Sequence, residues 1–365
     1  MSSIFGKNIK ISLFGESHGQ AIGVVIDGLK AGLKLNFDEI DKDLSYRSSN
    51  LNLFTERREP DKYEIISGYF NGFTTGTPLT FLIKNEDIKS SNYEKNKDNL
   101  RPSHADYTAY KKYYGFQDYR GGGHFSGRLT APLVIAGSIC KQILNKKQIL
   151  IASHIKQIYN LKDDDFDYNK IEEQINILNK KSFATLSKNV EEKMKTEIQN
   201  TKNSSDSIGG MIETVIIGNI IGIGDPFFDS VESVLSSLIF SIPGIKGVEF
   251  GLGFDFANKK GSEVNDEFYC DNKQIKTKTN NNGGINGGIA NGMPIVIKSV
   301  VKPTPSIAKV QKTVNYQTMQ EVDLKLEGRF DSCIVPRARI VVDSVVAIGI
   351  LDLLVTKYGY EWMEM

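Results

Sequence analysis

The sequence has little of what marks several common classes of protein. Of its 365 residues only three are cysteines, odd in number and widely spaced, which excludes a disulfide framework and a CxxC zinc site. Its 45 basic and 44 acidic residues leave a formal net charge of +1. This argues against a general nucleic-acid-binding protein, because affinity for a phosphate backbone needs a clustered basic excess. These shortages indicate a protein of a reducing compartment that does not act on nucleic acid.

Long apolar runs are also missing. The best candidate, residues 341–355, is interrupted by Asp343 and Asp352, and no run of 18 apolar residues occurs. The N-terminus shows no basic segment followed by the apolar stretch of a signal peptide. We therefore expect a cytoplasmic protein that does not associate with membranes.

The motifs of several large enzyme classes are absent. There is no GxxxxGK[ST] and no GxGxxG after a strand, which excludes a P-loop NTPase and a Rossmann dehydrogenase. The segment GHFSG (123–127) has the wrong spacing for the GxSxG motif of a serine hydrolase. No HxH, HxxxH or HExxH occurs, so we expect no metal site.

Glycine, in contrast, is frequent and clustered. The 33 glycines gather at 121–123, 208–210, 251–253 and 283–288, between apolar segments. Such clusters are typical of backbone that approaches a ligand closely.

The apolar patterns predict a mixture of strands and helices without regular βαβ alternation, which favours an α+β fold. Strands are expected within 8–30, 60–84, 209–224, 246–257 and 293–306, and helices within 38–46, 129–147, 226–243 (capped by Asp229 or Ser230) and from Arg337 onward. Residues 84–99 are expected to form a polar loop. We expect one domain, 1–365, with 156–203 as an exposed, polar helical excursion.

The histidines and arginines lie in the motif-like segments, whereas lysine dominates the polar loops. His18 lies in GESHG, His104 in RPSHAD and His124 directly after GGG. The arginines are Arg47, Arg57, Arg58, Arg101, Arg120, Arg128, Arg329, Arg337 and Arg339. Because the planar guanidinium holds carboxylates and phosphates in fixed geometry, this distribution predicts a small polyanionic ligand.

Two further segments have open interpretations. VKPTPS (301–306) offers a lysine and two hydroxyls on a proline-stiffened turn, either a phosphate cradle or only a turn. Asp331, in GRFDSC, is either a cap satisfied by Arg329 or a carboxylate close to a ligand and able to exchange a proton.

Seven ordered segments together resemble the chorismate synthase family. The resemblance runs from about residue 7 to the C-terminal helix, except for 156–203. The segments are GESHGQAIGVVIDGLKAG (15–32), RPSHADYT (101–108), DYRGGGHFSGRLTA (118–131), DSIGG (206–210), GGINGGIANG (283–292), KPTPSI (302–307) and GRFDSCIVPRA (328–338).

The resemblance implies a specific reaction and fold. Members of the family are lyases that eliminate phosphate from 5-enolpyruvylshikimate 3-phosphate to give chorismate, by an anti-1,4-elimination on the shikimate pathway to the aromatic amino acids. The reaction is redox-neutral overall but requires reduced FMN (FMNH2). The implied fold is a β-α-β sandwich with helices between antiparallel sheets, assembled as a homotetramer.

Roles follow residue by residue from the matching motifs. The catalytic positions are His18, the acid near the substrate, His104, which protonates the reduced flavin, and Asp331, which works with the flavin N5. Substrate-binding positions are Arg47, Arg101, Arg128 and Arg329. Flavin-contact positions are His124, Phe125, Ser126, Pro243, Gly244, Gly287, Lys302, Pro303, Thr304, Pro305, Ser306 and Arg329.

Several departures from the family pattern leave alternatives open. HFSGR stands where the family usually has RSSAR, RFDS stands for RHDP, Asp343 replaces a glutamate, and an arginine a few residues after Arg47 has no counterpart. One alternative is a flavin- or phosphate-ester-binding protein of the same fold with impaired turnover. Another is a bifunctional form that reduces its own flavin with NADPH; the missing arginine favours an external flavin reductant instead.

Overall fold

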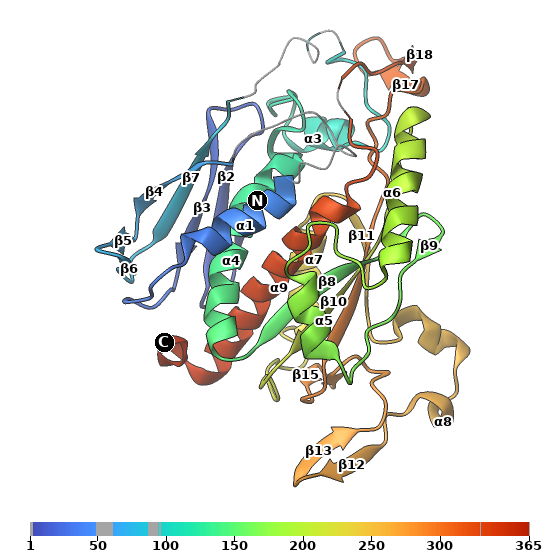
Figure 1. The fold of residues 1–365 in the computed structure, drawn as a ribbon. Coiled ribbons are helices and arrows are strands. Elements are labelled where there is room, and N and C mark those ends of the chain that lie inside the picture. The colour runs from blue at the N-terminus through green and yellow to red at the C-terminus, as the bar shows by residue number, and fades with distance from the viewer. Residues whose placement is uncertain (1–2, 49–60, 87–93, 95, 329, 365) are drawn as a thin grey trace.

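The chain forms two antiparallel sheets with helices packed between them (Figure 1). A computed structural model describes residues 3–48, 61–86, 94, 96–328 and 330–364. Each of the two sheets has five strands. The order in the first is β1-β2-β3-β7-β4, and in the second β11-β16-β10-β8-β9.

The strands of the two sheets come from different parts of the chain. The first sheet contains β1 (Ile4–Phe5), β2 (Lys10–Gly15), β3 (Ala21–Asp27), β4 (Tyr63–Ser67) and β7 (Leu79–Lys84). The second contains β8 (Leu150–Ile158), β9 (Leu161–Lys162), β10 (Gly210–Ile217), β11 (Ile245–Phe250) and β16 (Ile295–Val301).

Four two-stranded hairpins and several short helices complete the connections. The hairpins are β5 (Tyr69–Phe70) with β6 (Phe73–Thr74), β12 (Phe268–Asp271) with β13 (Gln274–Thr277), β14 (Ile285–Asn286) with β15 (Ile289–Ala290), and β17 (Gln311–Asn315) with β18 (Gln320–Leu324). The short helices are α3 (Asp106–Lys112), η1 (Gly123–Phe125), η2 (Gly127–Leu129), η3 (Gly253–Asn258), α8 (Gly261–Val264) and η4 (Tyr360–Met363).

Two long helices lie in the core between the sheets. Nearly every residue of α4 (Thr130–Lys146) and α9 (Val335–Tyr358) is buried, as expected for helices that are apolar all round. They pack closely at Gly137, where a Cβ atom would lie 2.6 Å from the carbonyl oxygen of Ser344. α1 (Phe37–Ser48) and α7 (Val231–Phe240) pack against α9 in the same layer. The expected α+β architecture is confirmed.

Most of the predicted elements are present, with differences at their edges. Ser230 is the N-cap of α7, since its side chain accepts a hydrogen bond from the backbone N–H of Ser233. Residues 60–84 hold the β5–β6 hairpin as well as β4 and β7, where two strands were expected. No described helix is long and apolar enough to cross a membrane.

The segment 156–203 differs from the expected exposed excursion. Its first residues belong to β8, and its two helices, α5 (Ile171–Leu178) and α6 (Lys188–Asn203), each bury an apolar face. Phe166, Ile175 and Leu178 pack on the sheet face that carries Ala152 and Val215. Because β8 turns Ser153 toward Asp343 of α9, this covered face is the outer one.

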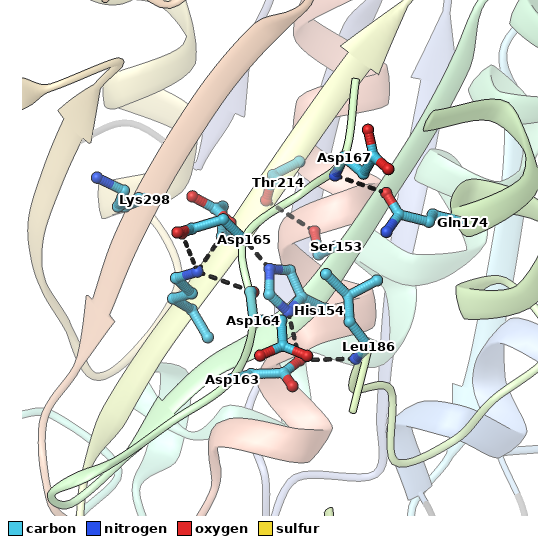
Figure 2. A network of polar contacts seen from close by, with 12 residues as sticks. Ser153, His154, Asp163, Asp164, Asp165, Asp167, Gln174, Leu186, Thr214 and Lys298 are labelled. Atoms are coloured by element: carbon cyan, nitrogen blue, oxygen red, sulfur yellow. Dashed lines mark hydrogen bonds and ion pairs between the residues drawn. The ribbon is translucent and has the colours of Figure 1, made fainter. Parts of the chain in front are cut away.

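A buried ionic network joins this segment to the second sheet (Figure 2). His154 of β8 is fully buried, with Nδ1 2.8 Å from Asp163 Oδ2 and Nε2 2.9 Å from Glu213 Oε2. The Asp163 carboxylate also accepts the backbone N–H groups of Leu186 and Ser187 at the start of α6. Burial alone would lower the pKa of His154, but the hydrogen bonds to Asp163 and Glu213 outweigh it and raise that pKa.

Candidate active site

A cavity of about 1600 Å³ lies where several separate segments of the chain meet. Its walls come from β1, β2 and the turn after β2, the stretch from residue 96 to α4, the end of α7 with the following loop, residues 302–306, 316–317 and 326–334, and α9. Most of the side chains predicted from the motifs line it. They are His18, Arg101, His104, His124, Phe125, Ser126, Pro243, Gly244, Lys302, Pro303, Thr304, Pro305, Ser306 and Asp331.

His18 lies in the turn where β2 ends, and it is buried. Its Nδ1 is 3.1 Å from Ser17 Oγ, and the Ser17 N–H donates to the carbonyl of Gly123. The ring packs directly against Gly121, which has φ +64°; a Cβ atom there would lie 2.5 Å from His18 Nδ1. The GGG cluster therefore provides the backbone surface on which this imidazole rests.

Arg101, His104 and Asp106 form a second polar unit in the wall. The Arg101 guanidinium donates from Nε and Nη2 to the two Asp106 oxygens, at 2.8 and 2.7 Å. His104 Nδ1 lies 2.7 Å from Asp106 Oδ1. Burial alone would raise the pKa of Asp106, but the hydrogen bonds from His104 and Arg101 hold it well below its usual range.

His124 connects the cavity to the N-terminal strands. Its Nδ1 is 2.9 Å from the carbonyl oxygen of Gly15, and its Nε2 is 3.0 Å from Ser3 Oγ. Since a carbonyl oxygen only accepts, Nδ1 carries a proton and donates to Gly15. Ser126 caps η2 by accepting the backbone N–H of Arg128.

The proline-stiffened segment 302–306, predicted as a phosphate cradle, also lines the cavity. Gly244 has φ +95°, and its carbonyl accepts the backbone N–H of Lys302. Lys302 Nζ donates to the carbonyl of Ser103 at 2.7 Å. Burial, and then the neighbouring Lys246, lower the pKa of Lys302. Thr304 Oγ1 is buried and has no hydrogen-bond partner among the described residues.

Asp331 forms an ion pair with Arg337. Arg337 Nη1 lies 2.7 Å from Asp331 Oδ2, and Arg337 Nε donates to the backbone carbonyl of Arg47. Arg329, predicted to bind substrate and cofactor and to satisfy Asp331, lies outside the described residues. Asp331 lines the cavity, so the structure places its carboxylate where a ligand can reach it.

Arg47 and Arg128, two predicted substrate ligands, are buried beside the cavity and do not line it. Both form ion pairs with Asp61, and Arg128 Nε also donates to Asn85 Oδ1 at 3.2 Å. Burial alone would raise the pKa of Asp61, but Arg47 and Arg128 outweigh it and lower that pKa. In this arrangement the two arginines face an internal carboxylate.

Gly287, a predicted flavin contact, is also outside the cavity. It forms the turn between β14 and β15 with φ +60°, and no heavy atom lies within 4 Å of where its Cβ would be. Figure 1 shows β15 far from α3, which follows the His104 loop.

Three charged residues in or beside the cavity were not singled out from the sequence. Asp106 lies two residues after His104 and Lys246 two residues after Gly244, so closeness to a motif residue was the available signal. Asp61 gave no signal, because its partners Arg47 and Arg128 are 14 and 67 residues away. Arg337 was predicted as one of the anion-holding arginines, but its pairing with Asp331 was not predicted.

Together, the fold and the cavity are those of an enzyme that acts on a small polyanion. Histidines, carboxylates and cations converge on one hollow, and no three His, Cys, Asp or Glu side chains of the described part of the chain gather as a metal site.

Comparisons with known proteins give the family. The family model for chorismate synthase matches residues 9–355. The chain is 46% identical over 356 residues to the chorismate synthase of Pyrococcus abyssi and 44% identical over 356 residues to that of Thermococcus gammatolerans, covering 98% of each chain in both cases. A crystal structure of a chorismate synthase superposes with a TM-score of 0.76 at 28% identity, covering 97% of this chain and 94% of the other. The chain belongs to the chorismate synthase family, and the predicted fold is confirmed.

Proposed function

We propose that the chain is a carbon–oxygen lyase that converts 5-enolpyruvylshikimate 3-phosphate into chorismate and phosphate. The observation that carries this proposal is the convergence of His18, His104 and Asp331 on one cavity that also holds Lys246 and Lys302. Family membership supplies the reaction, and the cavity supplies acid–base groups and cations for a substrate with one phosphate and two carboxylates.

His18 is the proposed acid for the leaving phosphate. In the elimination, the C–O bond to phosphate breaks and phosphate takes the electron pair, while a hydrogen leaves from the 1,4-related position on the opposite face. Negative charge therefore develops on the phosphate oxygen. A buried imidazolium at His18, oriented by Ser17 Oγ, places a proton on that oxygen.

The residues of segment 302–306 fit the flavin that the family requires. Thr304 Oγ1 is a buried hydroxyl without a partner among the described residues, and Lys302 and Lys246 line the same cavity. Lys302, Thr304 and Ser306 would hold the phosphate of FMN, and Phe125 would lie against its ring. When bound, reduced FMN supplies transient electron density to the substrate.

His104 and Asp331 are proposed to exchange protons near that cofactor. Both line the cavity, and each pairs with a charged neighbour, Asp106 for His104 and Arg337 for Asp331. Such pairs restrict the orientations that the two side chains adopt. Arg101 lines the same wall and is the proposed contact for a substrate carboxylate. Arg47 and Arg128 would bind the substrate only if their ion pairs with Asp61 were broken.

A homotetramer is the proposed assembly, in the cytoplasm. Several aromatic side chains are strongly exposed, among them Phe227 at 86% and Phe228 at 90%, and the β12–β13 hairpin projects from the body of the chain (Figure 1). Exposed apolar groups of this kind are typical of subunit contacts. Gly287 lies outside the cavity, so in this assembly it would contact the flavin only if a subunit contact brought it to the cavity of another subunit.

We also propose a single domain. The helices that pack against both sheets support this proposal.

Phosphate release under strict anaerobiosis tests the function. The substrate is supplied with FMN reduced by dithionite in one arm and with FMN and NADPH in the other. Release with dithionite alone is expected and identifies an enzyme that depends on an external reductant. Release with NADPH as well would show the bifunctional form. FMN binding without release in either arm would contradict the proposal and favour a binding protein with impaired turnover.

A further inference from the structure

One carboxylate of the cavity wall binds two other side chains that line the cavity. Asp106 is the first residue of α3, and its two oxygens accept four hydrogen bonds. Oδ2 accepts the backbone N–H and the Nε–H of Arg101, at 2.9 and 2.8 Å. Oδ1 accepts from Arg101 Nη2 and from His104 Nδ1, both at 2.7 Å. Both edges of the carboxylate are thus occupied by donors.

This arrangement determines which nitrogen of His104 carries the proton. An ionised carboxylate can only accept hydrogen bonds, so Nδ1 of His104 must be the donor. The pKa of Asp106 lies well below its usual range because the hydrogen bonds from His104 and Arg101 outweigh the effect of burial, so the carboxylate is ionised at neutral pH. Nε2 of His104 has no partner among the described residues, and the side chain lines the cavity.

We propose that Asp106 is the positioning residue of this site, fixing His104 as its Nδ1–H tautomer so that Nε2 is the nitrogen that exchanges a proton in the cavity. The inference rests on the proposed function, because it concerns the proton that His104 exchanges during turnover. Asp106 also lines the cavity, and its proposed effect on proton exchange is through His104.

The same carboxylate connects the His104 loop to the wall that supports His18. Arg101 Nη2 also donates to the carbonyl of Gly121 at 2.8 Å, and Gly121 is the residue against which the His18 ring packs. One chain of contacts therefore runs from His104 through Asp106 and Arg101 to His18. The links from His104 to Gly121 are hydrogen bonds, and the last link, from Gly121 to His18, is a packing contact.

An amide cannot replace this carboxylate. An asparagine at position 106 offers one accepting edge and one donating edge, whereas the structure presents donors to both. If its oxygen accepts the backbone N–H and Nε–H of Arg101, its NH2 group faces His104 Nδ1. His104 then accepts at Nδ1 and carries its proton on Nε2, which is the opposite tautomer.

A neighbouring carboxylate offers a matched control. Asp118 also lines the cavity and holds an arginine two residues away in a bidentate pair, with Arg120 Nε and Nη2 at 2.8 and 2.9 Å. It makes no contact with His104 among those the structure gives. Asp118→Asn therefore removes the same kind of ion pair without changing the partner of His104.

The test reads the tautomer directly, without turnover. Solid-state ¹⁵N NMR of full-length chain labelled at histidine nitrogens distinguishes protonated from unprotonated ring nitrogens, and the four histidines make the spectrum tractable. The His104 signals are assigned from the difference spectrum with His104→Gln. Wild-type chain, Asp106→Asn, Asp106→Glu and Asp118→Asn are compared, with kcat and KM for phosphate release measured on each.

The expected result is protonated Nδ1 at His104 in wild type, Asp106→Glu and Asp118→Asn, and protonated Nε2 in Asp106→Asn. The kcat of Asp106→Asn should fall about 10- to 100-fold, with partial recovery in Asp106→Glu. An unchanged tautomer in Asp106→Asn would overturn the inference whatever its kcat, and so would a changed tautomer with unchanged kcat. If Asp106→Asn does not fold, protonated Nε2 at His104 in Asp106→Glu would overturn it.

Failure of the proposed function gives a different pattern. In that case the wild-type chain would release no phosphate, while the tautomer comparison would still decide whether Asp106 fixes His104.

Discussion

Replacing Gly121 by alanine should slow turnover by moving His18. A Cβ atom at this position would lie 2.5 Å from His18 Nδ1 and 3.0 Å from Ser17 Oγ, whereas ordinary contacts begin at 3.4 Å. The imidazole must therefore shift by about 1 Å, and displacements of this size cost up to about 100-fold in rate. The φ of +64° adds a backbone penalty of about 1–2 kcal/mol to the free energy of folding, because alanine rarely adopts this conformation.

The assay is kcat for anaerobic phosphate release, together with the free energy of unfolding from urea denaturation. We expect kcat of Gly121→Ala to fall about 10- to 100-fold. Gly127→Ala is the matched control in the same glycine-rich loop, since its Cβ would have no heavy atom within 4 Å. Its free energy of unfolding should stay within about 0.5 kcal/mol of wild type. Equal kcat values for the two variants would refute the packing argument.

Three other predictions concern the cavity and the buried ionic network of His154. His104→Ala and Asp331→Ala should each lower kcat by about 10- to 10⁴-fold with an unchanged thermal unfolding curve, and wild-type turnover in either would remove its acid–base role. Lys302→Met should weaken FMN binding about 10- to 100-fold in a fluorescence titration, since a charge-assisted hydrogen bond is lost, whereas Lys309→Met, exposed and paired with Asp206, should bind as wild type. The raised pKa of His154 contributes stability that is fully present below about pH 6.5 and is lost as pH rises through the folded-state value. His154→Gln should lower the free energy of unfolding by about 3–5 kcal/mol at pH 6 and flatten its decline toward high pH; a parallel pH profile in urea denaturation would contradict this.

The helices of the core were predictable because their sequences are apolar on every side. Apolar residues occupy every face of α4 and α9, a pattern that is typical of an enclosed helix. β8 was not predicted, because several of its buried residues are polar. Ser153, His154 and Lys156 are buried, and each forms a hydrogen bond with a partner that the sequence pattern does not reveal. A strand that buries polar groups through ion pairs has the composition of an exposed segment.

The candidate site was predictable where short motifs hold both a reactive side chain and its support. RPSHAD contains Arg101, His104 and Asp106 within six residues, and the structure brings them into one unit. The partners of the arginines were harder to predict, because a motif indicates that an arginine binds an anion but not which anion it binds. Arg47 and Arg128 hold Asp61, which is 14 and 67 residues away in the chain.

We infer that this cavity eliminates phosphate and yields chorismate. The most direct measurement is the amount of phosphate and of chorismate formed from 5-enolpyruvylshikimate 3-phosphate, under anaerobic conditions with dithionite-reduced FMN, by the wild-type chain and by His18→Ala. We expect equal amounts of both products from the wild type and a rate lower by at least about 10-fold in the variant. Phosphate without chorismate, or equal rates from the two chains, would contradict it.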